Sequence, residues 1–111
     1  MNVKDFNEVI HRRLDLVEDT LSKKGLEYST ETDKMHNFNQ GAAFTGKIRE
    51  EVLLGFALKH WISIMDIIEN LKQNKLPTRE LLDEKIGDWV NYMCLLEASI
   101  VDKINNYEKL D

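Results

Sequence analysis

The stretch Glu84-Lys-Ile-Gly-Asp88-Trp-Val-Asn91-Tyr92 places two carboxylates and one amide at helical spacing inside an otherwise apolar segment. Side chains at positions i, i+4 and i+7 lie on one face of an α-helix, so Glu84, Asp88 and Asn91 form a single polar line. An acid among apolar neighbours is costly unless it is paired, hydrogen-bonded or bound to a metal ion. We therefore expect this line to have a partner, and the partner decides the function.

The composition is typical of a folded, highly charged helical domain. The chain has 111 residues, of which 42% are hydrophobic and 32% are charged, and we expect one domain spanning residues 1–111. Five glycines, one proline and the lack of β-type alternation favour long helices. Because so short a chain buries a modest core, we predict an all-α bundle of about four helices that forms a homodimer.

Charge and cysteine content narrow the function classes. The net charge of −5 argues against binding of bulk DNA or RNA, although a local cluster could still bind a small anion such as a nucleotide. Cys94 is the one cysteine, so no internal disulfide can form and a reducing compartment is expected. No apolar run approaches the ~20 residues of a membrane span, and the N-terminus is unlike a secretory signal. We expect a cytoplasmic protein, in a bacterial host if it is phage-encoded, with no membrane contact.

Apolar periodicity and turn residues predict four helices, over about residues 3–24, 37–44, 47–74 and 78–108. Gly25 is expected to end the first helix, and residues 26–37 read as a loop. Thr78 is the expected N-cap of the last helix, with Glu80 favouring the helix dipole in the first turn. Because the segment before Thr78 is short, we expect the two long helices to form an antiparallel hairpin.

The helix predicted over residues 47–74 carries a second polar line. Lys59, Ser63 and Asp66 lie at positions i, i+4 and i+7, and His60 is adjacent to them. If the two long helices form a hairpin, this line can face the Glu84 line. Polar groups that converge inside a helical bundle are where metal and cofactor sites are usually built.

We assign a Mg²⁺ ion and a phosphate group to this seam. Mg²⁺ takes oxygen ligands, often one or two carboxylates with substrate phosphates, and the expected metal ligands are Asp66, Glu84 and Asp88. Lys59, His60 and Asp66 are the candidate catalytic residues, with Lys59 and His60 binding phosphate oxygens. The alternative is that Lys59 pairs with Glu84 or Asp88 in a buried ion pair that only fixes the helix register.

A second group of polar and aromatic residues crowds positions 24–38. It consists of Lys24, Glu27, Tyr28, Asp33, His36, Asn37 and Phe38. Tyr28 or Phe38 could stack on a nucleotide base, and the Asn37 amide could hydrogen-bond to the edge of that base. The alternative is that Tyr28 and Phe38 attach the loop to the core while Asp33 or Asn37 caps the short helix.

These residues resemble a known family. The run Lys24-Gly-Leu-Glu27-Tyr28, followed by Asp33 and His36-Asn37-Phe38, resembles the opening block of small phage and prophage proteins known as nucleotide modification associated domain 1, a family of unknown function. Lys59-His60 and the Glu84–Tyr92 block are similar to the later blocks of that family. The resemblance covers about residues 21–98.

The acidic block also resembles the second acidic helix of the all-α nucleoside triphosphate pyrophosphatases, the MazG and dimeric dUTPase group. Members of that group bind Mg²⁺ with acids from two helices and cleave a nucleotide to its monophosphate and pyrophosphate. They carry a Glu-x-x-Glu type pair on the facing helix, where this chain has only Asp66 and Glu69 as acids. The resemblance therefore leaves open a single Mg²⁺ ion, or a nucleotide bound without turnover.

The function predicted from the sequence is a phage-type nucleotide-binding protein, with Mg²⁺-dependent pyrophosphate cleavage as its candidate reaction. Two alternatives stay open: a non-enzymatic phage protein that sequesters a nucleotide or binds a host protein, and a structural helical dimer. The residues expected to contact the nucleotide are Lys24, Tyr28, Asn37, Phe38, Asn91 and Tyr92.

Overall fold

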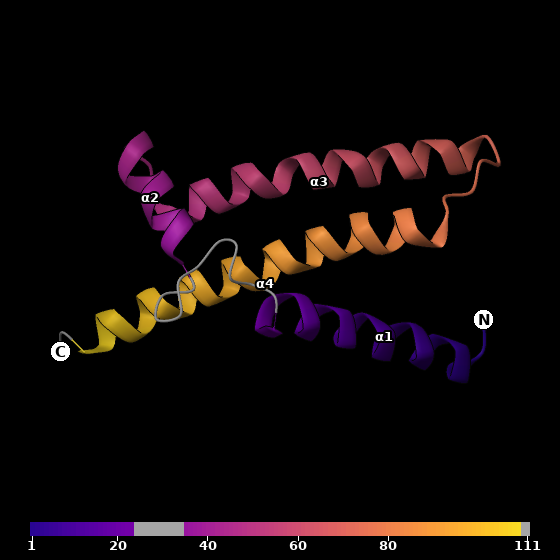
Figure 1. Cartoon of the computed structure of the whole chain (residues 1–111), viewed down its shortest axis with the longest axis horizontal. Helices are drawn as coiled ribbons and strands as arrows, with labels where there is room; N and C mark the ends of the chain where they lie inside the picture. Colours follow the sequence, from indigo (N-terminus) through magenta and orange to yellow (C-terminus); the bar gives the residue numbers. More distant parts are fainter. Residues whose placement is uncertain (24–34, 110–111) are drawn as a thin grey trace.

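The computed structural model describes residues 1–23 and 35–109, and over these residues it contains helices and no strand. The helices are α1 (Val3–Glu18), continued by the π-helix η1 (Asp19–Lys23), then α2 (His36–Thr45), α3 (Arg49–Lys72) and α4 (Arg79–Lys109). In Figure 1, α4 lies between α3 and α1, and α2 branches away near the start of α3. The all-α class and the packed α3/α4 pair are therefore confirmed for the described residues.

The first helix forms as its sequence pattern predicts. The side chain of Asn2 caps it by accepting the N–H of Asp5 at 2.7 Å, which satisfies one of the free donors of the first turn. Near the end of the predicted helix, Asp19–Lys23 wind as a π-helix. The expected end at Gly25 lies outside the described residues.

The short helix α2 starts one residue earlier than the pattern predicts. Its N-cap is Met35, which makes no side-chain cap bond, so Asn37 lies in the first turn and is not the capping residue. Asp33, the other candidate cap, lies outside the described residues. Gly46 ends α2 in the left-handed conformation, with φ of 70°, and its N–H bonds to the carbonyl of Ala42 at 3.0 Å.

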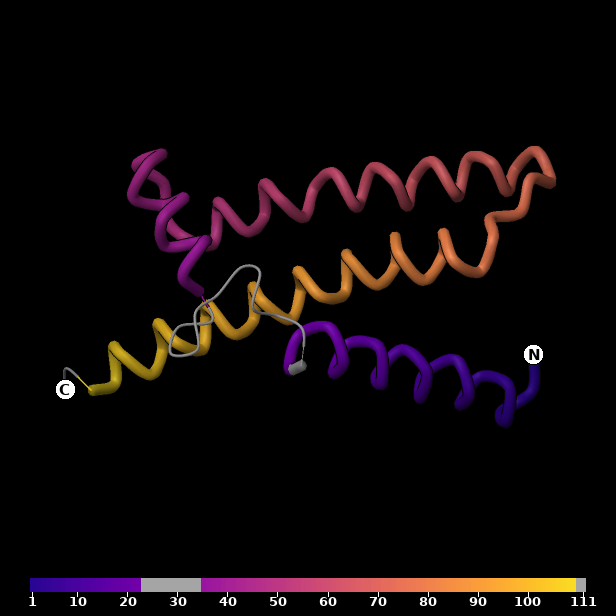
Figure 2. The backbone as a smooth tube through the Cα atoms, in the orientation of Figure 1, coloured from indigo at the N-terminus to yellow at the C-terminus, as the bar shows by residue number. Residues whose placement is uncertain are grey.

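The two long helices are joined at one end by residues 73–78, as the backbone trace shows (Figure 2). Asn74 has a positive φ of 59°, a conformation that asparagine tolerates better than most residues, and it turns the chain after α3. The Thr78 hydroxyl accepts the N–H of Leu81 at 3.1 Å, so the predicted N-cap of α4 is confirmed. Glu80 lies in the first turn, as expected.

Aromatic contacts set the pairing of α3 with α4. The rings of Phe56 and Tyr92 stack with centroids 6.5 Å apart, and those of Trp61 and Trp89 lie 5.2 Å apart. Trp61 follows Phe56 along α3, whereas its partner Trp89 precedes Tyr92 along α4.

The buried apolar core is small and lies where α2, α3 and α4 meet. It contains Met35, Phe38, Leu53 and Leu95, with Tyr92 among the half-buried side chains packed against it. Phe38 is only 3% exposed. This burial matches the alternative in which Phe38 anchors its segment to the core, because a base could stack on its ring only if the core opened.

A stripe of apolar side chains on α3 is about half exposed in the single chain, and only Trp61 among them makes the ring contact with α4 given above. Its side chains are spaced by four and three residues in turn, and each is between 42% and 53% exposed: Leu54, Leu58, Trp61, Met65 and Ile68. This is the heptad spacing of a helix that packs against another helix. Among the described helices, none combines the length and apolar content that crossing a bilayer requires.

Candidate functional site: a pocket between α1 and α4

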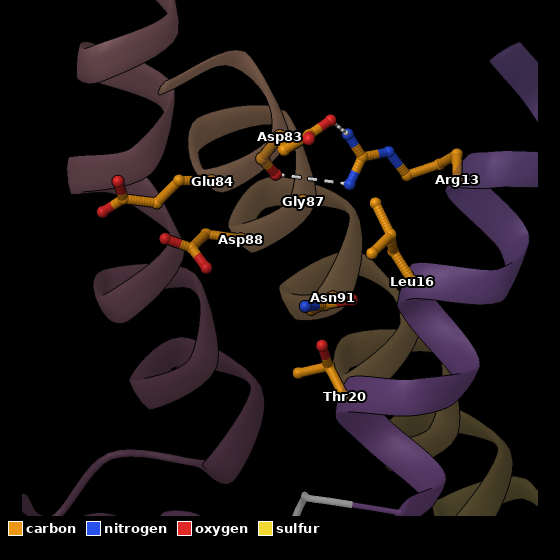
Figure 3. A pocket seen from close by; sticks show the side chains of 8 residues that line it. All are labelled: Arg13, Leu16, Thr20, Asp83, Glu84, Gly87, Asp88 and Asn91. Atoms are coloured by element: carbon orange, nitrogen blue, oxygen red, sulfur yellow. Dashed lines mark hydrogen bonds and ion pairs between the residues drawn. The ribbon is translucent and has the colours of Figure 1, made fainter. Parts of the chain in front are cut away.

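The polar line predicted on α4 lines one pocket. Glu84, Asp88 and Asn91 lie along a cavity of ≈ 240 Å³ whose other wall belongs to the N-terminal helix (Figure 3). The residues that line it are Arg13, Leu16, Thr20, Asp83, Glu84, Gly87, Asp88 and Asn91. In Figure 3 the two carboxylates point toward α3, while Arg13, Leu16 and Thr20 approach from the opposite side. The pocket thus has one acidic edge and one cationic edge.

Asn91 forms the buried part of this pocket. The residue is 8% exposed, and its Oδ1 has no hydrogen-bond partner within the described residues. Buried polar atoms in folded proteins nearly always have a partner, so an acceptor left open calls for a donor. A ligand N–H or O–H group, or a metal-bound water, would satisfy it.

His60 reaches across from α3 to the acidic edge. Its Nδ1 lies 3.4 Å from Oδ2 of Asp88, and its ring stacks on Tyr92 with centroids 5.2 Å apart. The imidazole is mostly buried, whereas the Asp88 side chain is 38% exposed. His60 and Asp88 therefore meet at the α3/α4 seam, although His60 lies beside the predicted α3 line of Lys59, Ser63 and Asp66 and not in it.

The other residues of the α3 polar line do not join this contact. Lys59 and Asp66 are exposed, and the Ser63 hydroxyl donates to the carbonyl of Lys59 at 3.2 Å. With about 3.6 residues per turn, Lys59 is rotated by about 100° and Asp66 by about 120° from the direction of His60. The face that α3 presents to Asp88 is therefore the His60 face.

The alternative in which Lys59 forms a buried ion pair with Glu84 or Asp88 does not match the structure. Lys59 is exposed, Glu84 pairs with its neighbour Lys85 at 3.6 Å, and Asp88 contacts His60. A pair that fixes helix register must be buried and must join two helices, and the Glu84–Lys85 pair does neither.

The predicted three-acid metal site is not assembled in this structure. The described residues hold no group of three His, Cys, Asp or Glu side chains placed to share one metal ion. Asp66 is not among the residues that line the pocket, because it lies on a different face of α3 from His60. Of the three acids that line the pocket, Glu84 and Asp88 point toward α3, whereas Asp83 pairs with Arg12 and Arg13.

The predicted nucleotide contacts do not lie together, and Phe38 among them is buried in the core. Asn91 lines the pocket, whereas Tyr92 stacks between His60 and Phe56 at the seam. Asn37 is exposed in the first turn of α2. Lys24 and Tyr28 lie outside the described residues.

The α1 side of the pocket was missed by sequence reasoning. Arg13 lies over Gly87, where a Cβ atom would come 2.7 Å from its Nη1, so the glycine permits this close approach. Arg13 Nη1 donates to the carbonyl of Asp83 at 3.3 Å. The sequence offered one indication of this contact: Gly87 lies inside the helix between Glu84 and Asp88, and a glycine inside a helix often marks a place where another segment packs closely. No sequence pattern identified Arg13 as that neighbour.

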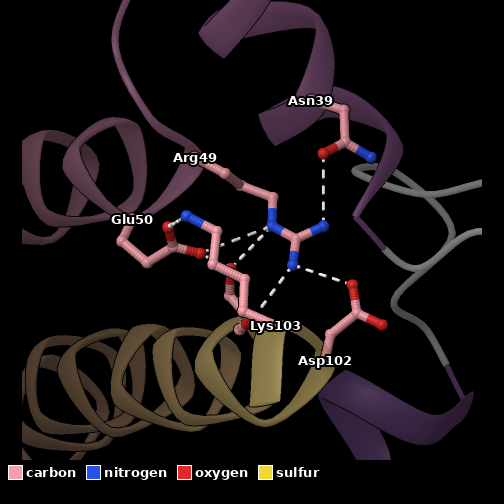
Figure 4. A network of polar contacts seen from close by, with 6 residues as sticks. Asn39, Arg49, Glu50, Asp102 and Lys103 are labelled. Atoms are coloured by element: carbon pink, nitrogen blue, oxygen red, sulfur yellow. Dashed lines mark hydrogen bonds and ion pairs between the residues drawn. The ribbon is translucent and has the colours of Figure 1, made fainter. Parts of the chain in front are cut away.

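A separate polar cluster ties the starts of α2 and α3 to the second half of α4 (Figure 4). Arg49 donates to the buried Ser99 hydroxyl at 2.6 Å, to the Ser99 carbonyl at 3.0 Å, to Asp102 at 3.0 Å and to Asn39 at 3.2 Å. Glu50 accepts hydrogen bonds from Ser99 and Lys103. Each charged group in the cluster has an opposite charge beside it, which is the arrangement of a structural clamp.

The hydrogen bonds and charges of this clamp lower the pKa of Glu50. Burial alone would raise the pKa of its carboxyl group, but hydrogen bonds from Lys103, Ser99 and the backbone, with the Lys103 charge, outweigh burial and lower the pKa from 4.5 to about 2. Glu50 therefore stays ionised at neutral pH and acts as a fixed anion.

The chemistry that the α1/α4 pocket can perform follows from its two edges. Carboxylates at one edge can hold a cation, the guanidinium at the other can hold an anion, and the open amide oxygen can accept a hydrogen bond. No family model, curated protein or solved structure matches this chain.

Proposed function

We propose that the chain binds a nucleotide together with Mg²⁺ in the pocket between α1 and α4. The observation that carries this proposal is that Glu84, Asp88 and Asn91 line one pocket and include a buried acceptor without a partner in the described residues. The resemblance of the acidic block to the second acidic helix of the all-α pyrophosphatases supports the same ligand class.

The donor set of the pocket fits Mg²⁺. Both carboxylates are accessible, with 60% of the Glu84 side chain and 38% of the Asp88 side chain exposed. Mg²⁺ usually takes one or two carboxylates and completes its shell with water and substrate phosphates, so Glu84 and Asp88 are enough to hold it. Mg²⁺ bound there would offset phosphate charge and lower the pKa of a coordinated water.

The residues of the chain then have separate tasks. His60 orients the Asp88 carboxylate through its 3.4 Å contact, and Asn91 accepts a hydrogen bond from the ligand or from a bound water. Lys59 is exposed and does not line this pocket, so it has no task there. Asp66 has no task in this version of the site. Cleavage to monophosphate and pyrophosphate is the candidate reaction, and binding without turnover is its alternative.

The test is thermal denaturation with each common dNTP and Mg²⁺, together with a pyrophosphate-release assay. At a ligand concentration 100 times the dissociation constant, the fold should gain about 2.7 kcal/mol. Asp88→Asn and Glu84→Gln should remove this gain, while Glu97→Gln, which alters an exposed acid of α4 outside the pocket, should retain it. Pyrophosphate release separates hydrolysis from binding alone, and no stabilisation of the native chain by any dNTP would end the proposal.

We also propose that two copies pair through the exposed α3 stripe, completing an antiparallel-hairpin bundle. The five stripe residues are spaced as a helix-packing seam and are about half exposed in the single chain. The same stripe on a second copy offers the apolar surface that such a seam needs. A host protein is the rival occupant, and a monomeric native chain would favour it.

A further inference from the structure

Two arginines of α1, Arg12 and Arg13, lie beside the Asp83 carboxylate, and Arg12 makes the stronger contact with it. Arg12 donates to both oxygens of Asp83, at 3.2 Å and 2.7 Å. Arg13 has its Nη2 3.6 Å from Oδ1 of Asp83, and the hydrogen bond of its Nη1 goes to the backbone carbonyl at 3.3 Å. Bidentate pairing with Arg12 already satisfies the carboxylate, so Asp83 does not depend on Arg13.

The two arginines also differ in where they lie. The Arg13 side chain is 19% exposed and lines the pocket that contains Glu84 and Asp88. Arg12 is 59% exposed and does not line that pocket, although both arginines line a neighbouring cavity of ≈ 370 Å³. Arg13 is therefore the cation that faces the proposed ligand.

The backbone beneath Arg13 is open because position 87 is glycine. A Cβ there would lie 2.7 Å from Nη1, and within 4 Å it would meet only atoms of Arg13. The Nη1 end of the guanidinium thus lies against α4 at the pocket wall, held by one long hydrogen bond and one long ion pair. A guanidinium fits phosphate oxygens with paired N–H donors, which makes phosphate a stronger partner than a backbone carbonyl.

We infer that Arg13 is the phosphate-binding residue of this pocket, and that a phosphate group takes the place of Asp83 beside it. The inference rests on the proposed function, and it assigns the phosphate end of the ligand to α1 and the metal end to Glu84 and Asp88. Arg12 keeps Asp83 neutralised when Arg13 turns to the ligand. Because the Asp83 carboxylate lies 3.6 Å from Arg13, it competes with the ligand phosphate for the Arg13 guanidinium.

The probe is inorganic pyrophosphate with Mg²⁺, titrated calorimetrically into the full chain. Arg13→Gln should weaken binding tenfold or more, and Arg13→Lys should give an intermediate loss because it keeps the charge without the paired donors. Asp83→Asn should tighten binding severalfold, because it removes the competitor. Asp15→Asn deletes the same charge from an exposed site on α1 outside the pocket and serves as the matched control, with affinity close to native.

The opposite signs at positions 13 and 83 separate a ligand role from a structural one. If Arg13 only attached α1 to α4, both substitutions would loosen the pocket and both would weaken pyrophosphate binding, which would overturn the inference. Thermal melting of each variant shows whether the fold is intact, and Arg13→Lys carries the comparison if Arg13→Gln unfolds.

The same titration with a dNTP distinguishes this inference from the proposed function. Nucleotide binding of equal affinity in native and Arg13→Gln chains overturns the inference and leaves the function standing. Arg13-dependent pyrophosphate binding, with no binding of any nucleotide, supports the inference and removes the nucleotide proposal. A native chain that binds no pyrophosphate at millimolar concentration overturns the inference.

Discussion

The imidazole Nδ1 of His60 lies 3.4 Å from Oδ2 of Asp88, across the seam between α3 and α4. The same ring stacks on Tyr92, so this one side chain joins the aromatic packing of the seam to the acidic edge of the pocket. Loss of His60 should therefore affect both stability and ligand binding.

The first prediction concerns the stability supplied by His60. His60→Ala should lower the free energy of unfolding by about 1–2 kcal/mol, because an aromatic pair contributes about 0.5–1.5 kcal/mol beyond its buried area and the Asp88 contact is also lost. Lys59→Ala, which alters the exposed neighbour on the same helix, should change it by less than about 0.5 kcal/mol. Urea denaturation measures both, and equal effects would show that the His60 stacking is not stabilising.

The second prediction is a loss of stability in acid that depends on Glu50. The folded pKa of about 2 lies below the ordinary glutamate pKa of 4.5, so the contribution of Glu50 is fully present above pH 4.5 and is lost as the pH falls through about 2. The difference corresponds to about 3 kcal/mol. The expected result is a decline in the urea-derived unfolding free energy between pH 5 and pH 2.

Glu50→Gln should remove this part of the acid dependence, because the amide does not titrate. Glu51→Gln is the matched control, since Glu51 is the exposed neighbour in the same first turn of α3. If the native chain and Glu50→Gln lose stability in parallel over this range, the cluster around Ser99 does not hold Glu50 ionised.

The difference between the predicted site and the observed one has a physical cause. Glu84, Asp88 and Asn91 belong to one helix, and spacing along a helix fixes which side chains share a face, so this half of the pocket could be predicted. Arg13 reaches the pocket through the docking of α1 on α4, which depends on tertiary packing that no local pattern encodes. The sequence could supply the acidic edge but not the cation opposite it.

The helices were predictable for the same reason, because their ends are set by local residues. Thr78 caps α4 as its residue type and position predicted, and Gly46 and Asn74 adopt positive φ close to where the predicted helices end. The orientation of α3 about its own axis was not predictable. Lys59 and His60 are neighbours in the sequence, and only packing decides that His60 faces α4 while Lys59 is exposed.

The third prediction uses Gly87 to test the contact with Arg13. An alanine inside a helix is about 1 kcal/mol more favourable than glycine, so Gly87→Ala should stabilise the chain unless its Cβ displaces Arg13. With Arg13 present, the gain should be smaller, because the new Cβ would lie 2.7 Å from Nη1 and the end of the Arg13 side chain must move away. In an Arg13→Ala background the space is free, and Gly87→Ala should recover the whole gain.

This double-mutant cycle is read from urea denaturation of the four chains. The expected result is that Gly87→Ala raises the free energy of unfolding more in the Arg13→Ala background than in the native background. Equal gains in both backgrounds would mean that the Arg13 side chain does not lie over Gly87 in solution, and the phosphate site inferred from that placement would lose its support.

The last prediction concerns the exposed stripe of α3. Leu58→Lys places a charge in the middle of the proposed seam, where desolvating it on association is costly. Sedimentation equilibrium should show a native dimer and at least a tenfold weaker association for Leu58→Lys. Phe44→Lys makes the same kind of change at a side chain that is 92% exposed on α2, outside the stripe, and should leave the dimer intact. If the native chain sediments as a monomer, the stripe does not pair two copies, and binding of a different protein there would be favoured. If both variants weaken the dimer equally, the contact covers a wider surface than α3.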